Sequence, residues 1–521
     1  MARSWHGLPL LLLPLAAAPV LVSLRAEAQL AREPQLRVLL QEGGPTATVA
    51  ALGGAGLRLR DRQGRVLQEL PIAAPLQLRL QQGWVEVRLA VAVAVSGAPA
   101  PEGPAHGLGP VDSATGAALQ PGAAPLAAGS RSVGVTSAAA SRVASPVLAG
   151  PELWIEPLQG GAEGGLVLNQ RRYRGRLQVL PQGSGVQVIN HVPLETYLAS
   201  VVGSEMPASW PQQALRAQAV AARTYALKGR KPAAPYDLKA TVASQVYRGI
   251  EAETPSTREA VAATRGLVLT YGSGLIDAVF HSSSGGNTES SGSLWNQQLP
   301  YLVSVPDFDQ ESPVAQWRQP LPADLLARAF AEIGGVRSIE VLTTTPTGRI
   351  RQARVVGPSG QLVLSGAALR SRLGLKSTWV RFELEVPAPA AGLATAALPG
   401  GSAISATALS PSPPPPLPAF SLPASGFDPA LQAAPAPIPL PQWVAIGRGF
   451  GHGIGMSQWG ALAMARRGDS FTAILSHYYR GTQLRPYGEL AAKAASGPGS
   501  WPAPAADGDA QVVARGPRPQ P

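Results

Sequence analysis

Glu205 is the residue whose surroundings best suit acid chemistry. Met206 and Pro207 follow it directly, and Trp210 comes shortly after, so we expect the carboxylate at a rigid corner beside apolar surface. Such surroundings raise the pKa of a carboxyl group toward the range that suits a general acid. A solvated turn glutamate or a helix-capping charge would have the same spacing, so the residues alone leave these roles open.

A strongly specified helix is predicted directly after this corner. Ser209 and Gln212 have the S-x-x-Q spacing of a capping box, and Pro211 fits a first helical turn because its missing N–H is not needed there. Apolar residues then follow at helical offsets of four, three and four: Leu215, Ala219, Ala222 and Ala226. The small alanines allow another element to approach closely, so we expect a buried helix that supports Glu205.

Two loops carry further groups that can bind a ligand. The loop at 281–289, H-S-S-S-G-G-N-T-E, follows a predicted strand and offers hydroxyl, imidazole and amide groups, which are common in sugar-binding sites and also in turns. No G-x-S-x-G frames its serines, so the sequence gives no support to a serine hydrolase.

The second loop, at 447–460, reads G-R-G-F-G-H-G-I-G-M-S-Q-W-G. Glycines at this density indicate positive φ angles or a close approach of the backbone to another group. The segment lacks the G-K-[ST] end of a phosphate loop, and the chain contains no H-E-x-x-H zinc motif. It leads into a helix predicted to end near Arg466, before Gly468.

The composition limits the classes of function. The chain of 521 residues contains no cysteine, which excludes disulfides, thiolate metal sites and a lipidated N-terminal cysteine. The net charge of +11 favours an anionic partner such as a cell-wall polymer, a lipid surface or a nucleic acid, although it can also follow from a composition rich in Ala, Gly, Pro and Arg. Nucleic acid is not expected, because the chain looks exported and its basic residues form no recognisable nucleic-acid-binding motif.

The N-terminus has the pattern of a signal peptide. Arg3 precedes an apolar run at 8–22, and Ala26-Glu27-Ala28 fits a cleavage site before Gln29. The run of about 15 residues is short for a membrane span of about 20. We therefore expect export to the periplasm or cell wall, with no stable membrane span after cleavage; an uncleaved anchor is the alternative.

Patterning along the chain predicts an α+β fold with mixed strands, short helices and Pro/Ala-rich insertions. Period-two alternation marks the first strands, and a further unit of strands with a capped helix at 365–373 is expected within 323–386. Ala, Gly, Pro and Ser tracts have too few large apolar residues to order themselves. The predicted regions are a signal peptide (1–28), a β-rich region (29–96), a low-complexity linker (97–150), a mixed domain (151–386), a Pro-rich disordered excursion (387–441), the last part of the mixed domain (442–490) and a disordered tail (491–521).

Several motifs, taken in order, resemble the stage II sporulation protein D family, also called the SpoIID/LytB domain. The resemblance covers roughly 153–484 apart from the Pro-rich excursion, so the mixed domain is expected to be SpoIID-like. The motifs are V-I-N with L-E-x-Y-L (188–198), E-M-P with A-Q-A-V-A-A-R-T-Y (205–225), S-Q-x-Y-x-G (244–249), H-S-x-x-G-G (281–286), L-G-L-K-S-T (373–378) and G-x-G-H-G-x-G-x-S-Q-W-G (449–460).

This resemblance implies a lytic transglycosylase that cuts the glycan of peptidoglycan, with a preference for strands stripped of stem peptides. The family's catalytic acid falls on Glu205. Its carboxyl group would protonate the glycosidic oxygen between muramic acid and glucosamine, then remove the proton from the muramic 6-hydroxyl as a 1,6-anhydro ring closes. Because no water enters, a second carboxylate is not required.

The glycan strand is the expected partner, and a cell-wall amidase is the second, because some relatives are named as amidase enhancers. Some relatives carry zinc on cysteine ligands; with no cysteine here, we expect no metal and no cofactor. Three alternatives stay open: a non-catalytic glycan-binding amidase enhancer, hydrolysis of the glycan with water, and a glycine-rich loop that is purely structural. Besides Glu205, the expected substrate-binding residues are Arg223, Tyr225, Gln245, Tyr247, His281, Ser282, Gly285, Gly286, Gly451, His452, Gly453, Gln458 and Trp459.

Overall fold

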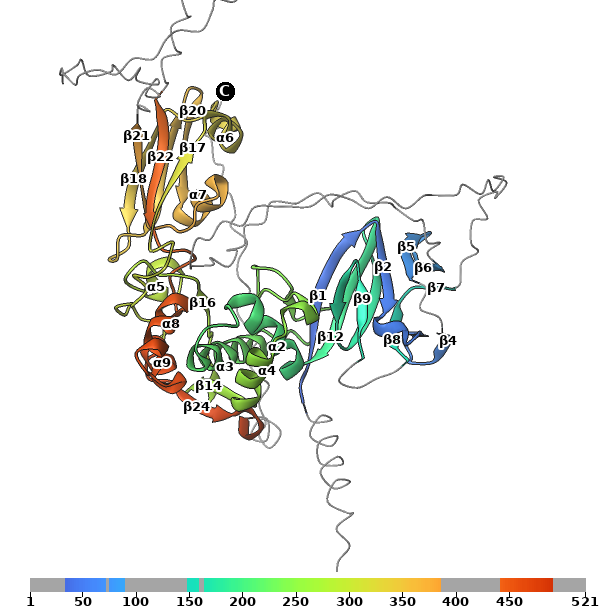
Figure 1. Ribbon diagram of the computed structural model, residues 1–521. Coiled ribbons are helices and arrows are strands. Elements are labelled where there is room, and N and C mark those ends of the chain that lie inside the picture. The colour runs from blue at the N-terminus through green and yellow to red at the C-terminus, as the bar shows by residue number, and fades with distance from the viewer. Residues whose placement is uncertain (1–32, 72–74, 90–147, 159–163, 386–440, 491–521) are drawn as a thin grey trace, which may run out of the picture. The chain divides into compact units, whose positions relative to one another are not determined.

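A computed structural model describes residues 33–71, 75–89, 148–158, 164–385 and 441–490 (Figure 1). The chain divides into two compact units, Met1–Ala315 with Gly449–Pro521, and Gln316–Arg448. The predicted signal peptide, disordered tail, nearly all of the linker and nearly all of the Pro-rich excursion lie outside the described residues. The last three linker residues, 148–150, form a strand.

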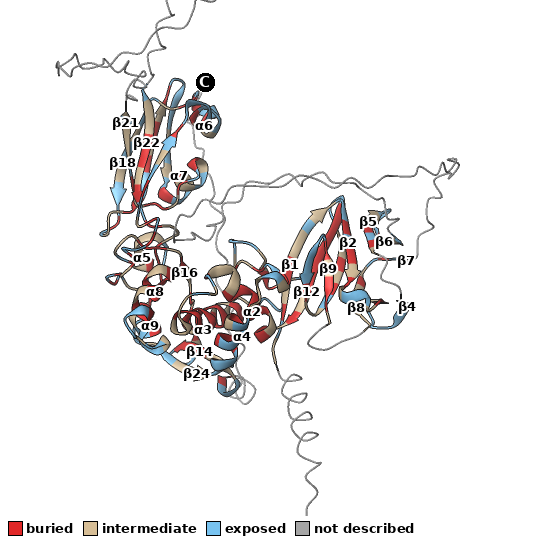
Figure 2. Cartoon of the chain, viewed as in Figure 1, coloured by how far each residue is buried: buried red, intermediate tan, exposed pale blue. Residues whose placement is uncertain are grey.

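Two largely antiparallel sheets form the β-rich part of the first unit. In β5, Leu76 and Leu78 are buried whereas Gln77 is exposed, which confirms the predicted alternation. Figure 2 shows that strands of this unit combine buried and exposed residues. The first sheet has the order β13 (Leu238–Lys239), β1 (Gln35–Gly44), β12 (Gly185–Pro193), β11 (Arg176–Gln182), β8 (Leu153–Pro157), β3 (Leu57–Arg60) and β4 (Val66–Leu70). The second has the order β10 (Arg171–Tyr173), β9 (Leu166–Leu168), β2 (Thr46–Ala51), β5 (Leu76–Gln81), β6 (Trp84–Leu89) and β7 (Leu148–Gly150).

The helical part of the first unit is built around α3, against which α2, α4, α8 and α9 pack (Figure 1). The strand pairs β14 with β24 and β16 with β23 place residues 456–486 beside residues 267–281. The helices are α2 (Leu194–Glu205), α3 (Gln212–Lys228), α4 (Pro255–Ala263), α5 (Ser291–Leu294), α8 (Gln458–Arg466) and α9 (Phe471–Tyr478), with 3₁₀ turns η1 (Leu52–Gly54) and η2 (Gly249–Ala252). The short strands are β14 (Leu267–Tyr271), β15 (Gly274–Leu275), β16 (Phe280–His281), β23 (Met456–Ser457) and β24 (Gln483–Pro486).

The structure confirms the buried face of α3 and corrects its beginning. All four apolar positions expected on that face are buried. The predicted capping box is wrong: Pro211 is the N-cap and no side chain caps the helix, while the Gln212 amide donates to Ser256. The reason is local, since Trp210 precedes a proline and is therefore disfavoured in the helical conformation that a cap at Ser209 would require.

The second unit combines two three-stranded sheets with short helices. As predicted, the Ser365 hydroxyl caps a helix by accepting a hydrogen bond from the N–H of Ala368 at 3.1 Å. The sheets are β17 (Gln316–Leu321), β22 (Gln442–Arg448) and β21 (Val380–Glu385), then β18 (Ser338–Thr344), β19 (Ile350–Gly357) and β20 (Gly360–Ser365). The helices are α6 (Ala323–Ala329), η3 (Ala331–Ile333) and α7 (Gly366–Leu373).

The predicted α+β class is confirmed, because both units combine largely antiparallel sheets with separate helices. None of the helices in the described part of the chain has both the length and the apolar character that crossing a membrane requires.

Candidate active site

The sequence predicted Glu205 at a rigid corner. The structure places it at the last residue of α2, and the chain leaves the helix directly after it. After it the backbone becomes extended at Met206, whose N–H still donates to the carbonyl of Val202. The C-terminal end of a helix carries a partial negative charge, so a second negative charge is disfavoured there. Glu205 keeps part of its surface accessible to solvent.

Two neutral donors hold the Glu205 carboxyl group. Its Oε1 accepts a hydrogen bond from the N–H of Val246 at 2.8 Å, and its Oε2 accepts one from the side-chain amide of Gln458 at 3.3 Å. Burial raises the pKa of Glu205, while the two donors and the charge of Arg248 act in the opposite direction. The carboxyl group therefore gains proton affinity while its ionised form keeps partners, which suits a group that gives and then takes a proton.

The loop that supplies the Val246 donor is anchored by the residues on either side of it. The side chain of Gln245 accepts from the hydroxyl of Tyr197 at 3.1 Å and donates to the carbonyl of Ala222 at 3.2 Å. The Tyr247 hydroxyl donates to Asn190 at 2.9 Å. Both predicted binding residues, Gln245 and Tyr247, are thus buried, and in this structure they position the donor to Glu205.

Gln458 and Trp459 are the first two residues of α8, which the Ser457 hydroxyl caps. The N–H of Trp459 donates to the carbonyl of Ser282 at 3.0 Å, which joins this helix to the loop after β16. The Trp459 ring meets the Trp210 ring edge to face, with centroids 5.3 Å apart. Trp210 was not among the predicted site residues; its signal was its position as an apolar neighbour of Glu205.

The two histidines lie side by side, with ring centroids 5.3 Å apart. The Nδ1 of His452 accepts from the N–H of Ile454 at 3.0 Å, so its Nε2 carries the proton and donates to the carbonyl of Phe280 at 3.0 Å. The His281 Nδ1 lies 3.2 Å from the carbonyl oxygen of Ile454. Gly451 has φ +118° and leaves no room for a Cβ, which would lie 2.6 Å from that of His281. The close backbone approach that the glycine density predicted is therefore the approach of Gly451 to His281 in β16.

The loop after His281 binds a buried acidic pair that no sequence motif indicated. Ser283 donates to Asp309 and Ser284 donates to Asp307, while the N–H of Gly285 donates to Asp309 at 2.7 Å. Burial, together with the neighbouring Asp309 carboxylate, raises the pKa of Asp307. The predicted binding residues Ser282, Gly285 and Gly286 thus lie on a loop that these two buried aspartates hold in place. No sequence spacing could reveal this, because the serines and aspartates lie more than twenty residues apart.

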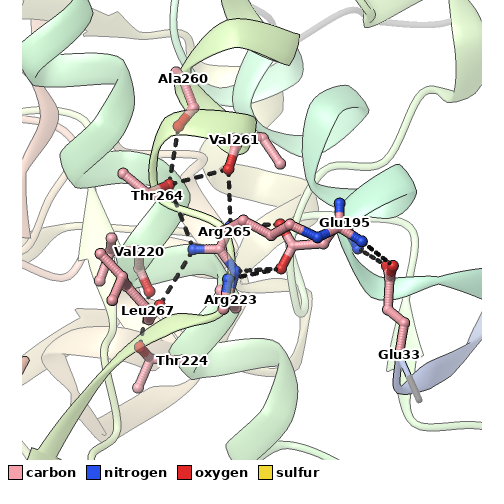
Figure 3. Close-up of polar contacts among 11 residues, drawn as sticks. Glu33, Glu195, Val220, Arg223, Thr224, Ala260, Val261, Thr264, Arg265 and Leu267 are labelled. Carbon is pink, nitrogen blue, oxygen red and sulfur yellow. Dashed lines mark hydrogen bonds and ion pairs between the residues drawn. The ribbon is translucent and has the colours of Figure 1, made fainter. Parts of the chain in front are cut away.

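Arg223 belongs to the interior of the first unit (Figure 3). Its guanidinium is fully buried and forms two hydrogen bonds with the Glu195 carboxylate, at 2.8 and 2.6 Å. It also donates to the carbonyl of Leu267 at 3.2 Å. Tyr225, another predicted binding residue, packs partly buried against the core of the same unit.

The structure thus brings Glu205, Gln458 and Trp459 together directly, and brings Gln245 and Tyr247 to the same place through Val246. Ser282 joins them through the N–H of Trp459. The segments around the paired strands β16 and β23 adjoin this group, and they contain His281, Gly451, His452 and Gly453. Within the described residues, no group of three His, Asp or Glu side chains is arranged to hold a metal ion.

Comparison with known proteins gives one family. Residues 182–271 match the family model described as stage II sporulation protein. The chain is 29% identical over 321 residues to stage II sporulation protein D of Bacillus subtilis (strain 168), which covers 57% of this chain and 76% of that protein. It is 30% identical over 319 residues to the amidase enhancer of the same bacterium, which covers 56% of this chain and 40% of that protein. Stage II sporulation protein D of Bacillus amyloliquefaciens is 29% identical over 327 residues, 57% of this chain and 75% of that protein.

Proposed function

Since the chain carries a domain of the stage II sporulation protein D family at residues 182–271, we propose that it is a peptidoglycan lytic transglycosylase. It cleaves the glycan strand between muramic acid and glucosamine and leaves a 1,6-anhydro end. The observation that carries this proposal is the Glu205 carboxyl group, which has a raised pKa, partial exposure and two neutral hydrogen-bond donors.

In the proposed reaction Glu205 acts twice. The protonated carboxyl group donates its proton to the glycosidic oxygen as the bond to the muramic C1 breaks. The resulting carboxylate, stabilised by Val246 and Gln458, then accepts the proton of the muramic 6-hydroxyl while that oxygen attacks C1. Atoms balance without water, so a single carboxyl group is sufficient. Trp210 and Trp459 offer apolar faces on which a sugar ring can stack.

The substrate implies the location. Peptidoglycan lies outside the cytoplasmic membrane, so the proposed enzyme works in the periplasm or cell wall, in agreement with the N-terminal pattern of a signal peptide. The net charge of +11 also suits a polyanionic envelope.

Mass spectrometry of products from purified, peptide-free glycan tests the reaction type. The transglycosylase produces fragments lighter by one water than the hydrolytic products. Fragments of the hydrolytic mass would instead assign a hydrolase. The proposal fails if the protein releases no fragments at all under conditions in which it is folded.

The Glu205→Gln variant tests the residue assignment. It keeps the shape of the side chain but removes the acid, so cleavage should fall by about 10²- to 10⁴-fold, or roughly 2.7 to 5.5 kcal/mol of barrier, while glycan binding survives. The matched control is Gln213→Glu at the first turn of α3, an exchange between the same two residue types at a side chain that binds the N–H of Phe471 and does not hydrogen-bond to Glu205. Release of fragments by Glu205→Gln at the rate of the unaltered protein would remove Glu205 from the mechanism.

The amidase enhancer relative supports a second candidate function, in which the protein binds glycan and activates a cell-wall amidase without cleaving anything. That candidate predicts no products from the protein alone, together with faster release of stem peptides when an amidase is added. The same incubation with Glu205→Gln separates the two, because an enhancer would keep its full effect in that variant.

A further inference from the structure

Arg248 is an exposed cation next to the proposed acid. It follows Val246, whose N–H binds Glu205, by two residues, and its charge acts on the Glu205 carboxyl group. Arginines such as Arg37 and Arg174 in the same unit are bound to Asp237 and Glu253. The guanidinium of Arg248, in contrast, has no hydrogen bond or ion pair with any residue that the structure describes, and it is solvent-exposed.

The backbone at Arg248 is held on both sides. Tyr247 is buried and its hydroxyl binds Asn190. Gly249 has φ +78° and lies so close to the carbonyl oxygen of Arg172 that a Cβ would be 2.0 Å from it. Burial also alternates along the loop, with Gln245 and Tyr247 inward and Arg248 outward. The loop therefore presents a cationic side chain from a fixed position beside Glu205.

A guanidinium in this position fits a carboxylate. Its planar fork of N–H groups matches the two oxygens of a carboxylate and forms two parallel charge-assisted hydrogen bonds. The glycan of the proposed reaction offers such a group, because the lactyl ether of muramic acid ends in a carboxylate once the stem peptide is removed. While the peptide is attached, the same carbonyl belongs to a neutral amide, which offers one acceptor oxygen and no charge.

We propose that Arg248 is a specificity-determining residue that binds the free lactyl carboxylate of the muramic acid whose glycosidic bond is cleaved, and so selects peptide-free strands. This inference rests on the proposed function, since it takes the glycan as the ligand. Selection then depends on a charge on the sugar that disappears when a peptide is attached, not only on the space that a peptide needs.

The test compares two ligands that differ in that charge and otherwise only by a small N-methyl group. One is peptide-free glycan, and the other is the same glycan with its lactyl carboxylates converted to N-methylamides. We expect the unaltered protein to prefer the carboxylate form by about tenfold or more in kcat/KM. Arg248→Gln should lose that tenfold on the carboxylate form, mainly through KM, and change little on the amide form. Arg248→Lys keeps the charge without the fork and should fall between the two.

Arg230→Gln is the matched control, because Arg230 is also an exposed arginine of this unit, but its charge is not among those that act on Glu205. It should keep the full preference. The inference is overturned if Arg248→Gln retains the preference for the carboxylate form. It is also overturned if the variant changes both substrates equally and only moves the pH profile, because Arg248 would then act on Glu205 alone.

Binding measured by calorimetry in the Glu205→Gln background separates this inference from the proposed function. There the preference for the carboxylate form should persist and should vanish on adding Arg248→Gln. If the unaltered protein cleaves neither glycan while this binding preference depends on Arg248, the reaction assignment fails and the specificity assignment holds. If neither glycan binds, both fail.

Discussion

At the scale of single residues, the chemistry depends on how the surroundings of Glu205 balance its two protonation states. Burial and the C-terminal end of α2 disfavour the anion, whereas the donors at Val246 and Gln458 favour it. If the surroundings only disfavoured the anion, the protonated group would be too weak an acid; if they only favoured it, the group would be ionised before the reaction begins and its carboxylate would be a weak base.

The pH profile should report this balance. Because the reaction begins with the protonated carboxyl group, kcat/KM should fall as pH rises through the raised pKa of Glu205. Gln458→Leu removes a donor that lowers this pKa, so the midpoint of the alkaline limb should move to higher pH. Gln213→Leu, which loses a hydrogen bond between α3 and the first residue of α9, is the control and should leave the midpoint in place. A midpoint that moves down, or not at all, in Gln458→Leu would contradict the assignment.

His452 makes a different kind of prediction. Both of its ring nitrogens bind main-chain groups, one within the glycine-rich loop and one at Phe280. His452→Ala removes two hydrogen bonds and should lower the free energy of unfolding by about 1 to 3 kcal/mol. Thermal unfolding followed by circular dichroism measures this, with glycan cleavage assayed well below the melting temperature. If stability is unchanged and cleavage falls tenfold or more, His452 contacts the glycan instead of holding the loop.

At the scale of elements, the helices around Glu205 are held by the buried pair of Arg223 on α3 and Glu195 on α2. Further hydrogen bonds connect this pair to Glu33 and Arg265 (Figure 3). The N–H of Glu195 donates to Glu33 at 2.6 Å, and Arg265 binds the other oxygen of Glu33 at 2.6 Å. Since Glu195 and Glu205 lie at opposite ends of α2, this network fixes the helix that carries the proposed acid.

Breaking this pair should therefore cost stability. Arg223→Met leaves the Glu195 carboxylate buried without its cation, and we expect the free energy of unfolding to fall by about 3 to 5 kcal/mol. The double variant Arg223→Met with Glu195→Leu should recover much of that loss. Lys239→Met, which breaks the exposed pair with Glu42, is the control and should cost about 1 kcal/mol or less. A loss in Arg223→Met no larger than in this control would show that the pair is not structural.

The sequence could predict those elements that depend on interactions between residues close together in the chain. The strands with one buried face, the buried face of α3 and the Ser365 cap of α7 each depend on residues a few positions apart, and they were predicted. Helix α2 was not, because it is buried on several sides, so its apolar residues show no single-sided period. The donors to Glu205 come from residues 41 and 253 positions away in the chain, which no local pattern contains.

At the scale of the whole molecule, long segments of low complexity begin and end at paired strands. Glu385 at the end of β21 pairs with Gln442 at the start of β22. In the first unit, β6 and β7 are likewise antiparallel neighbours, although residues 90–147 separate them in the chain. In both places the two ends of the insertion are already held together by the sheet, so the fold does not require a long connection.

The tract at 387–441 should therefore be replaceable. A short Gly/Ser linker can join the paired ends of β21 and β22, and the entropy of closing a loop changes only slowly with its length. We expect the second unit to keep its free energy of unfolding to within about 2 kcal/mol, with any change toward greater stability because the shorter loop costs less to close. Differential scanning calorimetry measures this, and glycan cleavage should be unchanged.

A variant with the same 387–441 residues in scrambled order is the control, because it keeps the length and composition while destroying specific contacts. If the tract only connects β21 to β22, the scrambled variant melts as the unaltered protein does and the linker variant melts at the same temperature or slightly higher. A large loss of thermal stability in both variants would show that the tract packs on the fold through particular residues. A loss of cleavage in both, with stability kept, would assign those residues to glycan binding.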